Sequence, residues 1–426
     1  MRWLLRRSAG EARLIRDVGI AGCGVAGLAC AALLRRQGLR VVVYDKLETP
    51  QPLGSGLILQ PVGLHVLDEI GAGDRIRALG AVIERLFGRV VPSQRVVLDV
   101  RYDAFGRDAP TGVAVHRGAL FQALYDAALE AGTEIAAGRE IVGAAAGRFA
   151  FANGAQSPRF DLLIDALGVR STLSQAPKAN LPYGALWASL DWQAGFDPHA
   201  LEQRYEAARK MAGVLPIGRL PGRENNQAAF FWSLRGRHEA AWRGAPIEAW
   251  KDQVRALWPE TAGFLEQIGA HDDLVFARYA HRTCASPLGR HVVHVGDSWH
   301  CTSPQLGQGA NMALLDALAL ATALRAQSNL DAALGEYERL RLWHIRLYQA
   351  ASYLFTPAYQ SDSTLIAGLR DWLMAPLSRV PPAPQILAAL VAGSWGAPLS
   401  AIGIRQSAVG NSDERHRLQS RRSTAD

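Results

Sequence analysis

The chain has 426 residues, of which 49% are hydrophobic and 20% are charged. This size and balance are typical of a globular protein with two or three structural units and a sizeable core, and they exclude a disordered or fibrous protein. The net charge of +7 comes mainly from scattered arginines, which form no basic stripe of the kind that marks a nucleic-acid-binding face. The four cysteines lack a CxxC spacing, which favours reduced thiols in a cytoplasmic protein over disulfides or a metal site.

A glycine-rich turn joins the first predicted strand, residues 17–21, to the first predicted helix, residues 25–37. In its sequence, GCGVAG, the glycines let the backbone approach a pyrophosphate that lies at a helix N-terminus. The second predicted strand, residues 39–44, ends on Asp45, roughly 20 residues after the turn, the offset at which a carboxylate binds an adenosine ribose. The residues predicted to hold a dinucleotide here are Gly22, Gly24, Gly27, Asp45 and Lys46.

Two β-like segments without dinucleotide motifs interrupt the alternation of strands and helices. The first, residues 82–102, is predicted to be a hairpin that turns around Pro92. The second, about residues 180–282, contains several strand patterns, with predicted helices over residues 198–211 and 247–258. Together the two segments indicate a sheet inserted into a discontinuous dinucleotide-binding unit.

Aromatic side chains are concentrated in the inserted sheet. Because strand side chains alternate between the two faces, Phe231 is expected to face away from Phe230 and Trp232. Some of these rings must be core, yet as a group they favour an apolar, aromatic substrate, since no arginine cluster suited to a carboxylate accompanies them. The candidates for the pocket wall are Trp187, Phe231 and Trp232.

A second glycine-rich segment, GDSWHCTSPQLGQGAN, spans residues 296–311 and precedes a predicted helix over residues 312–325. Backbone amides at a helix start stabilise negative charge, so this segment is a candidate for the other end of the bound dinucleotide. Beyond it, residues 330–392 are predicted to be mostly helical, with an amphipathic run over residues 337–353.

The two glycine-rich segments together resemble the class A flavoprotein monooxygenases, the family of para-hydroxybenzoate hydroxylase and the ubiquinone-biosynthesis hydroxylases. The resemblance implies FAD as the cofactor, with the acid of the GD pair, Asp297, on the ribityl chain and Pro304 beside the ring. It also implies that the backbone amides of residues 309–311 hold the pyrimidine edge of the flavin. The residues implied at this end are Asp297, Pro304, Gly307, Gly309, Ala310 and Asn311.

Two further segments bear on this resemblance. The stretch that begins at His116 resembles the family segment whose arginine, here Arg117, reaches the flavin phosphates or the ribityl chain. Where the family usually has an Ala-Asp-Gly triplet tied to FAD binding and NAD(P)H use, residues 166–168 are Ala-Leu-Gly. The carboxylate is either lost or moved to Asp165. At the adenine end, a backbone amide and carbonyl within residues 141–143 are expected to hold the base.

The leading hypothesis is an FAD-dependent monooxygenase that hydroxylates an apolar aromatic substrate, phenolic or quinone-precursor, through a flavin hydroperoxide with NAD(P)H and dioxygen as co-substrates. The sequence has no second GxGxxG unit, so NAD(P)H is expected to visit the flavin only transiently. No general base is assigned, and His300 is given a structural role. Two alternatives stay open: a same-fold prenyl reductase or flavin halogenase, and a non-catalytic flavin-binding protein, which the altered triplet suggests.

The predicted fold class is α/β: a Rossmann-like FAD-binding domain with an inserted mixed β-sheet substrate domain and C-terminal helices. The inserted sheet is expected to form one wall of the substrate pocket. The predicted units are an N-terminal extension (1–16), three parts of the FAD-binding domain (17–81, 105–179 and 285–329), a substrate-domain hairpin (82–104), a substrate domain (180–284), a C-terminal helical region (330–406) and a disordered tail (407–426).

Membrane contact is considered for two segments. Residues 1–16 mix arginines with leucines but lack a long apolar stretch and a cleavage site, which favours a disordered extension over a membrane-surface helix or a secretory signal. Residues 386–404 are uncharged, yet their glycines, serines and proline predict a helix to about Ala392, then a turn and an apolar loop. No transmembrane segment is expected, and a peripheral contact that admits an apolar substrate stays open.

Overall fold

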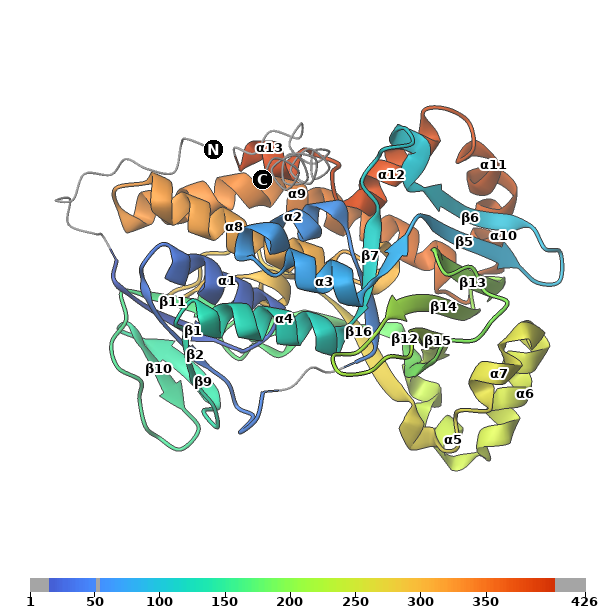
Figure 1. Ribbon diagram of the computed structural model, residues 1–426, viewed down its shortest axis with the longest axis horizontal. Coiled ribbons are helices and arrows are strands. Elements are labelled where there is room, and N and C mark those ends of the chain that lie inside the picture. The colour runs from blue at the N-terminus through green and yellow to red at the C-terminus, as the bar shows by residue number, and fades with distance from the viewer. Residues whose placement is uncertain (1–14, 51–53, 403–426) are drawn as a thin grey trace, which may run out of the picture.

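The computed structural model describes residues 15–50 and 54–402, and within them the strands form four sheets. Figure 1 shows an elongated molecule with a parallel sheet and its helices in one half and a larger sheet in the other. The predictions for residues 1–14 and for the tail, 407–426, lie outside the described residues.

One half of the molecule is built on a five-stranded sheet with the order β17-β11-β1-β2-β8. All of its pairings are parallel, as expected where crossover connections join the strands. The strands are β1 (Asp17–Ala21), β2 (Arg40–Tyr44), β8 (Glu134–Ala136), β11 (Leu162–Asp165) and β17 (Val293–His294). This topology confirms the predicted Rossmann-like α/β fold.

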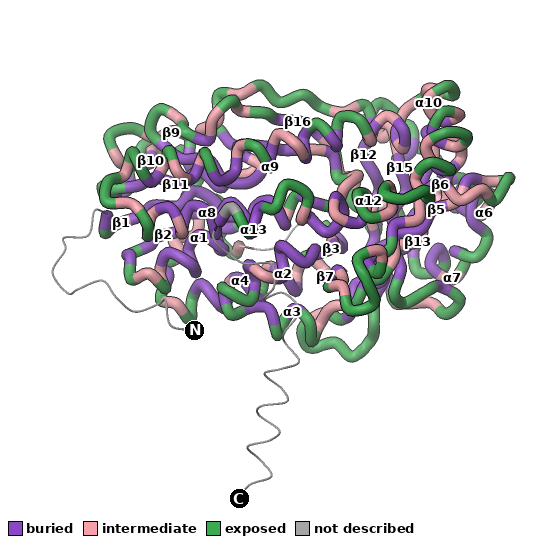
Figure 2. Tube along the Cα trace, turned by 90° about the horizontal axis from the view of Figure 1, so that it is seen from above, coloured by how far each residue is buried: buried purple, intermediate pink, exposed green. Residues whose placement is uncertain are grey.

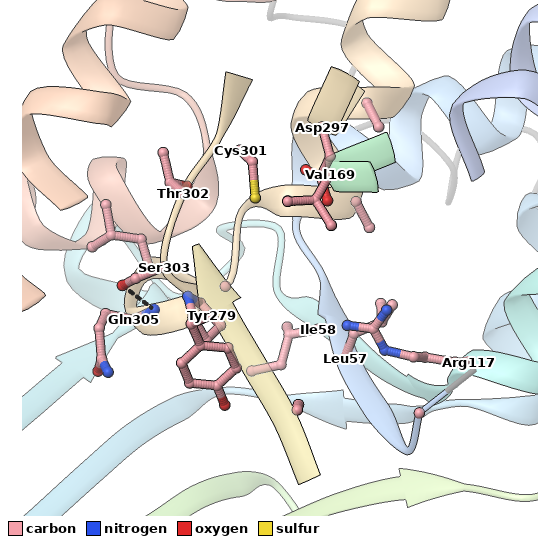
Figure 3. A pocket seen from close by; sticks show the side chains of 18 of the residues that line it. Leu57, Ile58, Arg117, Val169, Tyr279, Asp297, Cys301, Thr302, Ser303 and Gln305 are labelled. Atoms are coloured by element: carbon pink, nitrogen blue, oxygen red, sulfur yellow. Dashed lines mark hydrogen bonds between the residues drawn. The ribbon is translucent and has the colours of Figure 1, made fainter. Parts of the chain in front are cut away.

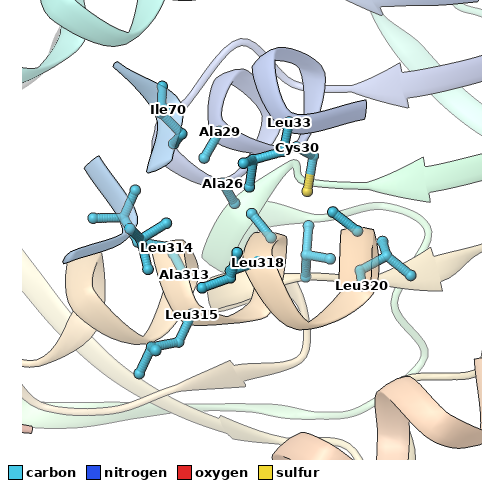
Figure 4. Close-up of a cluster of buried hydrophobic side chains, with 14 of the residues drawn as sticks. Ala26, Ala29, Cys30, Leu33, Ile70, Ala313, Leu314, Leu315, Leu318 and Leu320 are labelled. Carbon is cyan, nitrogen blue, oxygen red and sulfur yellow. The ribbon is translucent and has the colours of Figure 1, made fainter. Parts of the chain in front are cut away.

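Three helices pack around this parallel sheet: α1 (Val25–Arg36), α4 (Arg117–Glu130) and α8 (Gly309–Ala326). Figure 4 shows small side chains of α1, such as Ala26 and Cys30, on the face toward α8, which lets the two helices approach closely. Burial raises the pKa of the Cys30 thiol, so this side chain stays neutral and packs as a small apolar group. All four cysteines are free, as predicted.

The other half contains an eight-stranded mixed sheet with the order β18-β16-β12-β15-β14-β13-β5-β6. Its strands are β5 (Arg85–Val90), β6 (Val96–Arg101), β12 (Lys178–Asp191), β13 (Ala200–Glu206), β14 (Lys210–Gly218), β15 (Gln227–Arg235), β16 (Val275–Thr283) and β18 (His300–Cys301). Only β13 and β5 pair in parallel. The antiparallel pair β5 and β6 confirms the predicted hairpin around Pro92.

The predicted helix over residues 198–211 is wrong. This segment forms β13 and the start of β14, which pair with each other and with β5 and β15. Its Ala, Leu, Glu, Gln and Arg residues favour a helix, but pairing along both edges of β13 outweighs that local preference. The predicted helix over residues 247–258 is confirmed as α6 (Ile247–Leu257), which packs on the sheet face that carries Phe230 and Trp232.

Two smaller sheets complete the strands, and the three-stranded one, in the order β3-β7-β4, contacts β14 of the larger sheet. It thereby connects the two halves. The remaining elements before the C-terminal helices are β3 (Gly56–Leu59), α2 (Pro61–Ile70), α3 (Gly73–Leu79), β4 (Ala81–Ile83), β7 (Gly112–His116), β9 (Ile141–Ala145), β10 (Arg148–Phe151), α5 (Glu239–Gly244) and α7 (Ala262–Leu265).

The C-terminal helices run back along both halves, with α11 and α12 beside β5 and β6 (Figure 1). They are α9 (Leu330–Tyr359), α10 (Thr364–Leu369), the π-helical η8 (Arg370–Met374), α11 (Ala375–Leu377), α12 (Ala383–Ala392) and α13 (Pro398–Ala401). The end of α12 agrees with its prediction, and Gly393 caps it with a φ of 79°. Figure 2 shows buried chain along the strands and α8. In the described ranges, no helix combines the length and apolarity needed to cross a bilayer.

Candidate functional site

A cavity of about 1500 Å³ extends from the glycine-rich turn after β1 to the eight-stranded sheet and the C-terminal helices. Small-molecule pockets usually measure about 300–1,000 Å³, so this space suits a large ligand and a second, smaller one together. Figure 3 shows its middle section, where side chains from both halves of the molecule converge.

The glycine-rich turn forms one end of this cavity. A Cβ added at Gly27 would lie 2.0 Å from the Gly22 carbonyl oxygen, so this position requires glycine for the packing of α1 on the turn. A Cβ added at Gly24 would meet nothing within 4 Å, and Gly24 lines the cavity. The turn therefore leaves its backbone open to a ligand at the start of α1.

Asp45, at the end of β2, holds this turn in place. Its Oδ2 accepts a hydrogen bond of 2.9 Å from the Cys23 amide, and its Oδ1 accepts one of 2.9 Å from the Leu47 amide. Asp45 and Lys46 both line the cavity, together with Ile141 of the predicted adenine segment. These contacts leave carboxylate lone pairs for a ligand hydroxyl beside the turn.

Arg117 and Asp297 point into the middle of the cavity from opposite halves of its wall (Figure 3). The Arg117 amide donates to the Ser55 carbonyl at 2.8 Å, whereas its guanidinium makes no hydrogen bond within the described part of the chain. Burial raises the pKa of Asp297, against the opposing effect of His300 and Arg117. Arg117 thus presents unused donors to an anionic ligand.

A fully buried acid, Asp316, supports the Asp297 turn from behind. Its Oδ2 accepts hydrogen bonds from the Gly296 amide at 2.8 Å and from His300 Nε2 at 2.6 Å. Its Oδ1 accepts from Arg341 Nε at 2.8 Å. Burial alone raises the pKa of Asp316, but the charges of His300 and Arg341 bring it below its usual value. His300 therefore has the structural role predicted for it.

Asp316 and Arg341 were not identified in the sequence. The sequence did contain signals for this pair, because an acid lies inside the apolar helix 312–325 and an arginine lies in the amphipathic run 337–353. Burying a charged side chain costs free energy unless an opposite charge pairs with it, so each residue indicated a buried partner.

The loop before α8 forms the next part of the wall. Pro304 and Gly307 bound a single 3-10 turn, and Gly309 and Ala310 begin α8; all four line the cavity. Their position leaves first-turn amides without intrahelical acceptors. Asn311 does not line the cavity through its side chain. This amide accepts from the Gln60 amide at 2.8 Å and donates to the Ile58 carbonyl at 3.1 Å, and so ties α8 to β3.

The turn after β11 contains the altered triplet, residues 166–168, and begins at Asp165. Asp165 is fully buried, and its carboxylate accepts hydrogen bonds from the Leu167 amide at 3.0 Å and the Ser171 hydroxyl at 2.5 Å. It also contacts His294 Nδ1 at 2.7 Å. Leu167 and Gly168 line the cavity, whereas Asp165 does not. Asp165 thus shapes the turn after β11 without reaching the ligand space.

Residues 16–347 match the FAD binding domain family. The chain belongs to this family and is a class A FAD-dependent monooxygenase. FAD is its cofactor, and NAD(P)H is the usual co-substrate of the family. The enzyme is 28% identical over 365 residues to 3-amino-4-hydroxybenzoate 2-monooxygenase of Streptomyces cremeus, covering 77% of this chain and 84% of that protein.

The chain is also similar to a second relative and to a solved structure. A putative 2-heptyl-3-hydroxy-4(1H)-quinolone synthase of Rhodococcus erythropolis is 27% identical over 343 residues, covering 78% of this chain and 86% of that protein. The structure of PqsL from P. aeruginosa in complex with 2-aminobenzoylacetate superposes with a TM-score of 0.72 at 20% identity, covering 84% of this chain and 99% of that chain. This last similarity establishes the shared fold.

The residues of the cavity fit FAD. The open space at Gly24 and the unused donors of Arg117 suit a pyrophosphate, and the carboxylate of Asp45 suits a ribose hydroxyl. At the far end, the first turn of α8 presents amides where a flavin ring carries negative charge when reduced. The cofactor in this position would span from Asp45 to the loop at Pro304.

Aromatic side chains line the cavity beyond this loop. The rings of Trp187 and Phe231 pack at a tilt of 31° with centroids 4.6 Å apart, and Trp187 Nε1 donates to the Tyr279 hydroxyl at 3.1 Å. Tyr279 lies beside the loop at Ser303 and Gln305 (Figure 3), and it was not among the residues predicted for the pocket. A single tyrosine in a strand pattern does not by itself indicate a pocket residue, so the pattern offered no reason to choose it.

The predicted placement of Trp232 in the pocket wall is wrong. Trp232 lies on the opposite face of β15 from Phe231, in the core that also contains Phe230 and Trp250 of α6. It is 3% exposed and does not line the cavity. The period-two alternation of the strand, which separates Phe231 from its two neighbours, explains this placement.

Proposed function

We propose that this enzyme hydroxylates an apolar aromatic substrate, phenolic or quinone-precursor, with dioxygen and with NAD(P)H as the electron donor. The observation that carries the proposal is the packed ring pair of Trp187 and Phe231, which lines the cavity beside the flavin-binding loop. Aromatic rings on a pocket wall favour a flat, apolar ligand. Relatives such as kynurenine 3-monooxygenase of Xanthomonas campestris bear names that agree with an aromatic substrate.

When bound and reduced, FAD supplies the activation of dioxygen. The protein's own residues position the substrate and exclude water. Trp187 and Phe231 hold the plane of the substrate ring. Because the Trp187 indole donates to the Tyr279 hydroxyl oxygen, the hydroxyl proton of Tyr279 is free to be donated to a substrate oxygen. Burial raises the pKa of Tyr279 to about 12, so this hydroxyl stays protonated and acts as a hydrogen-bond donor near neutral pH.

The test is oxygen-isotope incorporation by the FAD-loaded enzyme. With NADH or NADPH and a panel of phenols, we expect substrate-stimulated oxidation of the nicotinamide and a product that carries one atom from labelled dioxygen. Phe231→Ala should raise KM more than it lowers kcat, because this ring pair orients the substrate without reacting. Reduction of a substrate double bond without label would indicate a reductase, and halide-dependent products would indicate a halogenase. Either result contradicts the proposal.

A further inference from the structure

The pocket at Trp187 continues across the eight-stranded sheet as a floor of paired residues. Neighbouring strands contribute residues in direct register, so one row of positions crosses the sheet from β12 to β6. This row consists of Trp187, Phe231, Gly213, Gln203, Gly88 and Leu98. From β15 to β6 the row covers four strand spacings of about 4.8 Å, or about 19 Å. One aromatic ring at Phe231 leaves most of this length unfilled.

Two glycines keep the floor flat. A Cβ at Gly213 would lie 2.0 Å from the Phe231 ring, and one at Gly88 would lie 2.7 Å from the Tyr205 ring. Because these positions lack side chains, the Phe231 and Tyr205 rings pack against the backbone of the neighbouring strand and do not project into the cavity. The space above the strands is therefore preserved for a ligand.

The opposite wall of this extension is apolar and comes from the C-terminal helices. Met374, Leu377, Leu387 and Leu390 line the cavity there. Leu377 is 56% exposed although it lines the cavity, so the extension opens to solvent beside α11. The extension is thus a channel with apolar floor, apolar roof and an open end.

The polar groups along this channel are already engaged. Gln203 accepts from the Tyr205 hydroxyl at 2.9 Å and donates to Met211 Sδ at 3.3 Å. Arg370 donates to the Ala358 carbonyl at 2.9 Å, to the Ala207 carbonyl and to the adjacent carboxylate of Asp371. The Asp99 carboxylate, likewise, is bound by Arg85 at 2.7 and 2.8 Å. Arg370 and Asp99, the charged side chains that line this channel in the described part of the protein, are therefore already paired and offer no partner to an ionic ligand.

We infer that this channel, defined by the floor of β13 to β6 and the roof at Met374 and Leu387, is a second subsite that binds a linear alkyl or prenyl chain carried by the substrate ring. This inference rests on the proposed function for the ring end. In an apolar channel without free charges, each buried methylene of the ligand strengthens binding. A carboxylate on the ligand would lose its hydration there without finding a partner. The substrate class is therefore a phenol or quinone precursor with a long apolar substituent.

The experiment is isothermal titration calorimetry of the FAD-loaded enzyme with phenol, 4-ethylphenol, 4-butylphenol and 4-heptylphenol. Each methylene that enters the channel should tighten binding by about fourfold. A chain that ends in a carboxylate, in 4-hydroxyphenylheptanoate, should bind more weakly than 4-heptylphenol. Equal affinity for phenol and 4-heptylphenol would overturn the inference.

Matched variants locate the effect in the channel. Met374→Asp places a charge on the roof, and should abolish the gain from chain length while phenol binds as before. Leu373→Asp places the same charge on the adjacent side chain, which is 50% exposed and does not line the cavity, and should leave the chain-length gain intact. If Met374→Asp fails to fold, Leu377→Asp at the exposed mouth replaces it. Equal effects of the cavity variant and Leu373→Asp would contradict the assignment.

The two proposals fail in different ways. If the chain-length gain is present but labelled oxygen does not enter any phenol, the channel stands and the proposed reaction is wrong. If phenols are hydroxylated but their affinities do not depend on the length of the alkyl substituent, the proposed reaction stands and the channel assignment is wrong.

Discussion

Gly24 and Gly27 belong to one sequence motif but have opposite surroundings. Gly27 is enclosed by the backbone of its own turn, where a Cβ would lie 2.0 Å from the Gly22 carbonyl oxygen. Gly24 faces the open cavity. The absence of a side chain therefore serves the fold at one position and the ligand space at the other.

This contrast predicts different outcomes for two substitutions. Gly24→Val should fold with the thermal midpoint of the wild-type apoprotein but lose FAD, because the new side chain occupies the pyrophosphate space. Gly27→Val should lower the thermal midpoint strongly or prevent folding, because α1 must move away from the turn. Flavin absorbance per mole of protein and circular dichroism melting measure both effects. Normal flavin content in Gly24→Val would contradict the placement of the pyrophosphate.

Asp297 is the second residue whose surroundings predict a ligand effect. Asp297→Ala removes a carboxylate from the cavity wall without removing a hydrogen bond that supports the fold. Loss of a charged hydrogen bond costs about 1.5–3 kcal/mol, so the Kd for FAD should rise roughly ten- to hundredfold. Fluorescence titration of apoprotein with FAD measures this change, and Asp103→Ala, on an exposed surface, is the control. An unchanged Kd would exclude a contact between Asp297 and the cofactor.

At the scale of elements, one buried chain of polar contacts links α8, α9 and α12. Asp316 of α8 binds Arg341 of α9, whose Nη1 donates to His344 Nδ1 at 3.0 Å. His344 Nε2 then donates to the carbonyl of Gly393, at the end of α12, at 3.2 Å. Because Asp316 also supports the turn of Asp297, these contacts connect the C-terminal helices to the flavin site.

This chain of contacts predicts a pH dependence of stability. Burial, with Arg341 nearby, lowers the pKa of His344 from 6.5 to about 2. Between these values the unfolded chain binds a proton at His344 that the folded protein does not, so the stabilisation is complete above pH 6.5 and is lost as pH falls. The slope from this group is about 1.4 kcal/mol per pH unit.

Urea unfolding at pH 7.5, 6.5 and 5.5 measures this slope. His344→Gln should lose stability less steeply between pH 6.5 and 5.5 than the wild type, whatever its stability at pH 7.5. His291→Gln, at an exposed position, should retain the wild-type slope. An identical slope for His344→Gln and wild type would show that this histidine is not held neutral in the folded state.

At the scale of the whole molecule, one cavity receives side chains from the parallel sheet, the eight-stranded sheet and the C-terminal helices. FAD bound there would lie between Gly24, just before α1, and Ala310 of α8. A ligand that binds only the folded protein stabilises it by mass action. We therefore expect cofactor binding and folding to be coupled.

Removal of FAD should lower the thermal midpoint, and readdition should restore it in a concentration-dependent way. At a free FAD concentration of a hundred times Kd, the stabilisation is about 2.7 kcal/mol. Differential scanning calorimetry of apoprotein over a series of FAD concentrations measures the shift. Gly24→Val serves as the control and should show no shift with FAD. A midpoint of the wild type that does not depend on FAD would exclude this coupling.

Several features of the protein were predictable from local sequence. The glycine turn, the GD segment and the acid at Asp45 were recognised because a turn, a helix start and a strand end each need particular residues within a short stretch. The hairpin around Pro92 and the end of α12 followed for the same reason. The cavity residues Gly24, Arg117 and Pro304 were placed together by the resemblance, and their roles toward FAD stay predictions.

Tertiary structure decided the features that depend on pairing between distant segments. The stretch 198–211 became strand because β5 and β14 pair with it, against its local preference. Asp316 binds Arg341 of another helix and His300 of β18, and Asp165 shapes its turn through contacts with Ser171 and His294. Neither set of contacts could be derived from the spacing of residues in the sequence. The channel beyond Phe231 exists only because six strands align in register beneath the C-terminal helices. The sequence does not reveal such an alignment, because residues that neighbour one another across a sheet have no fixed spacing along the chain.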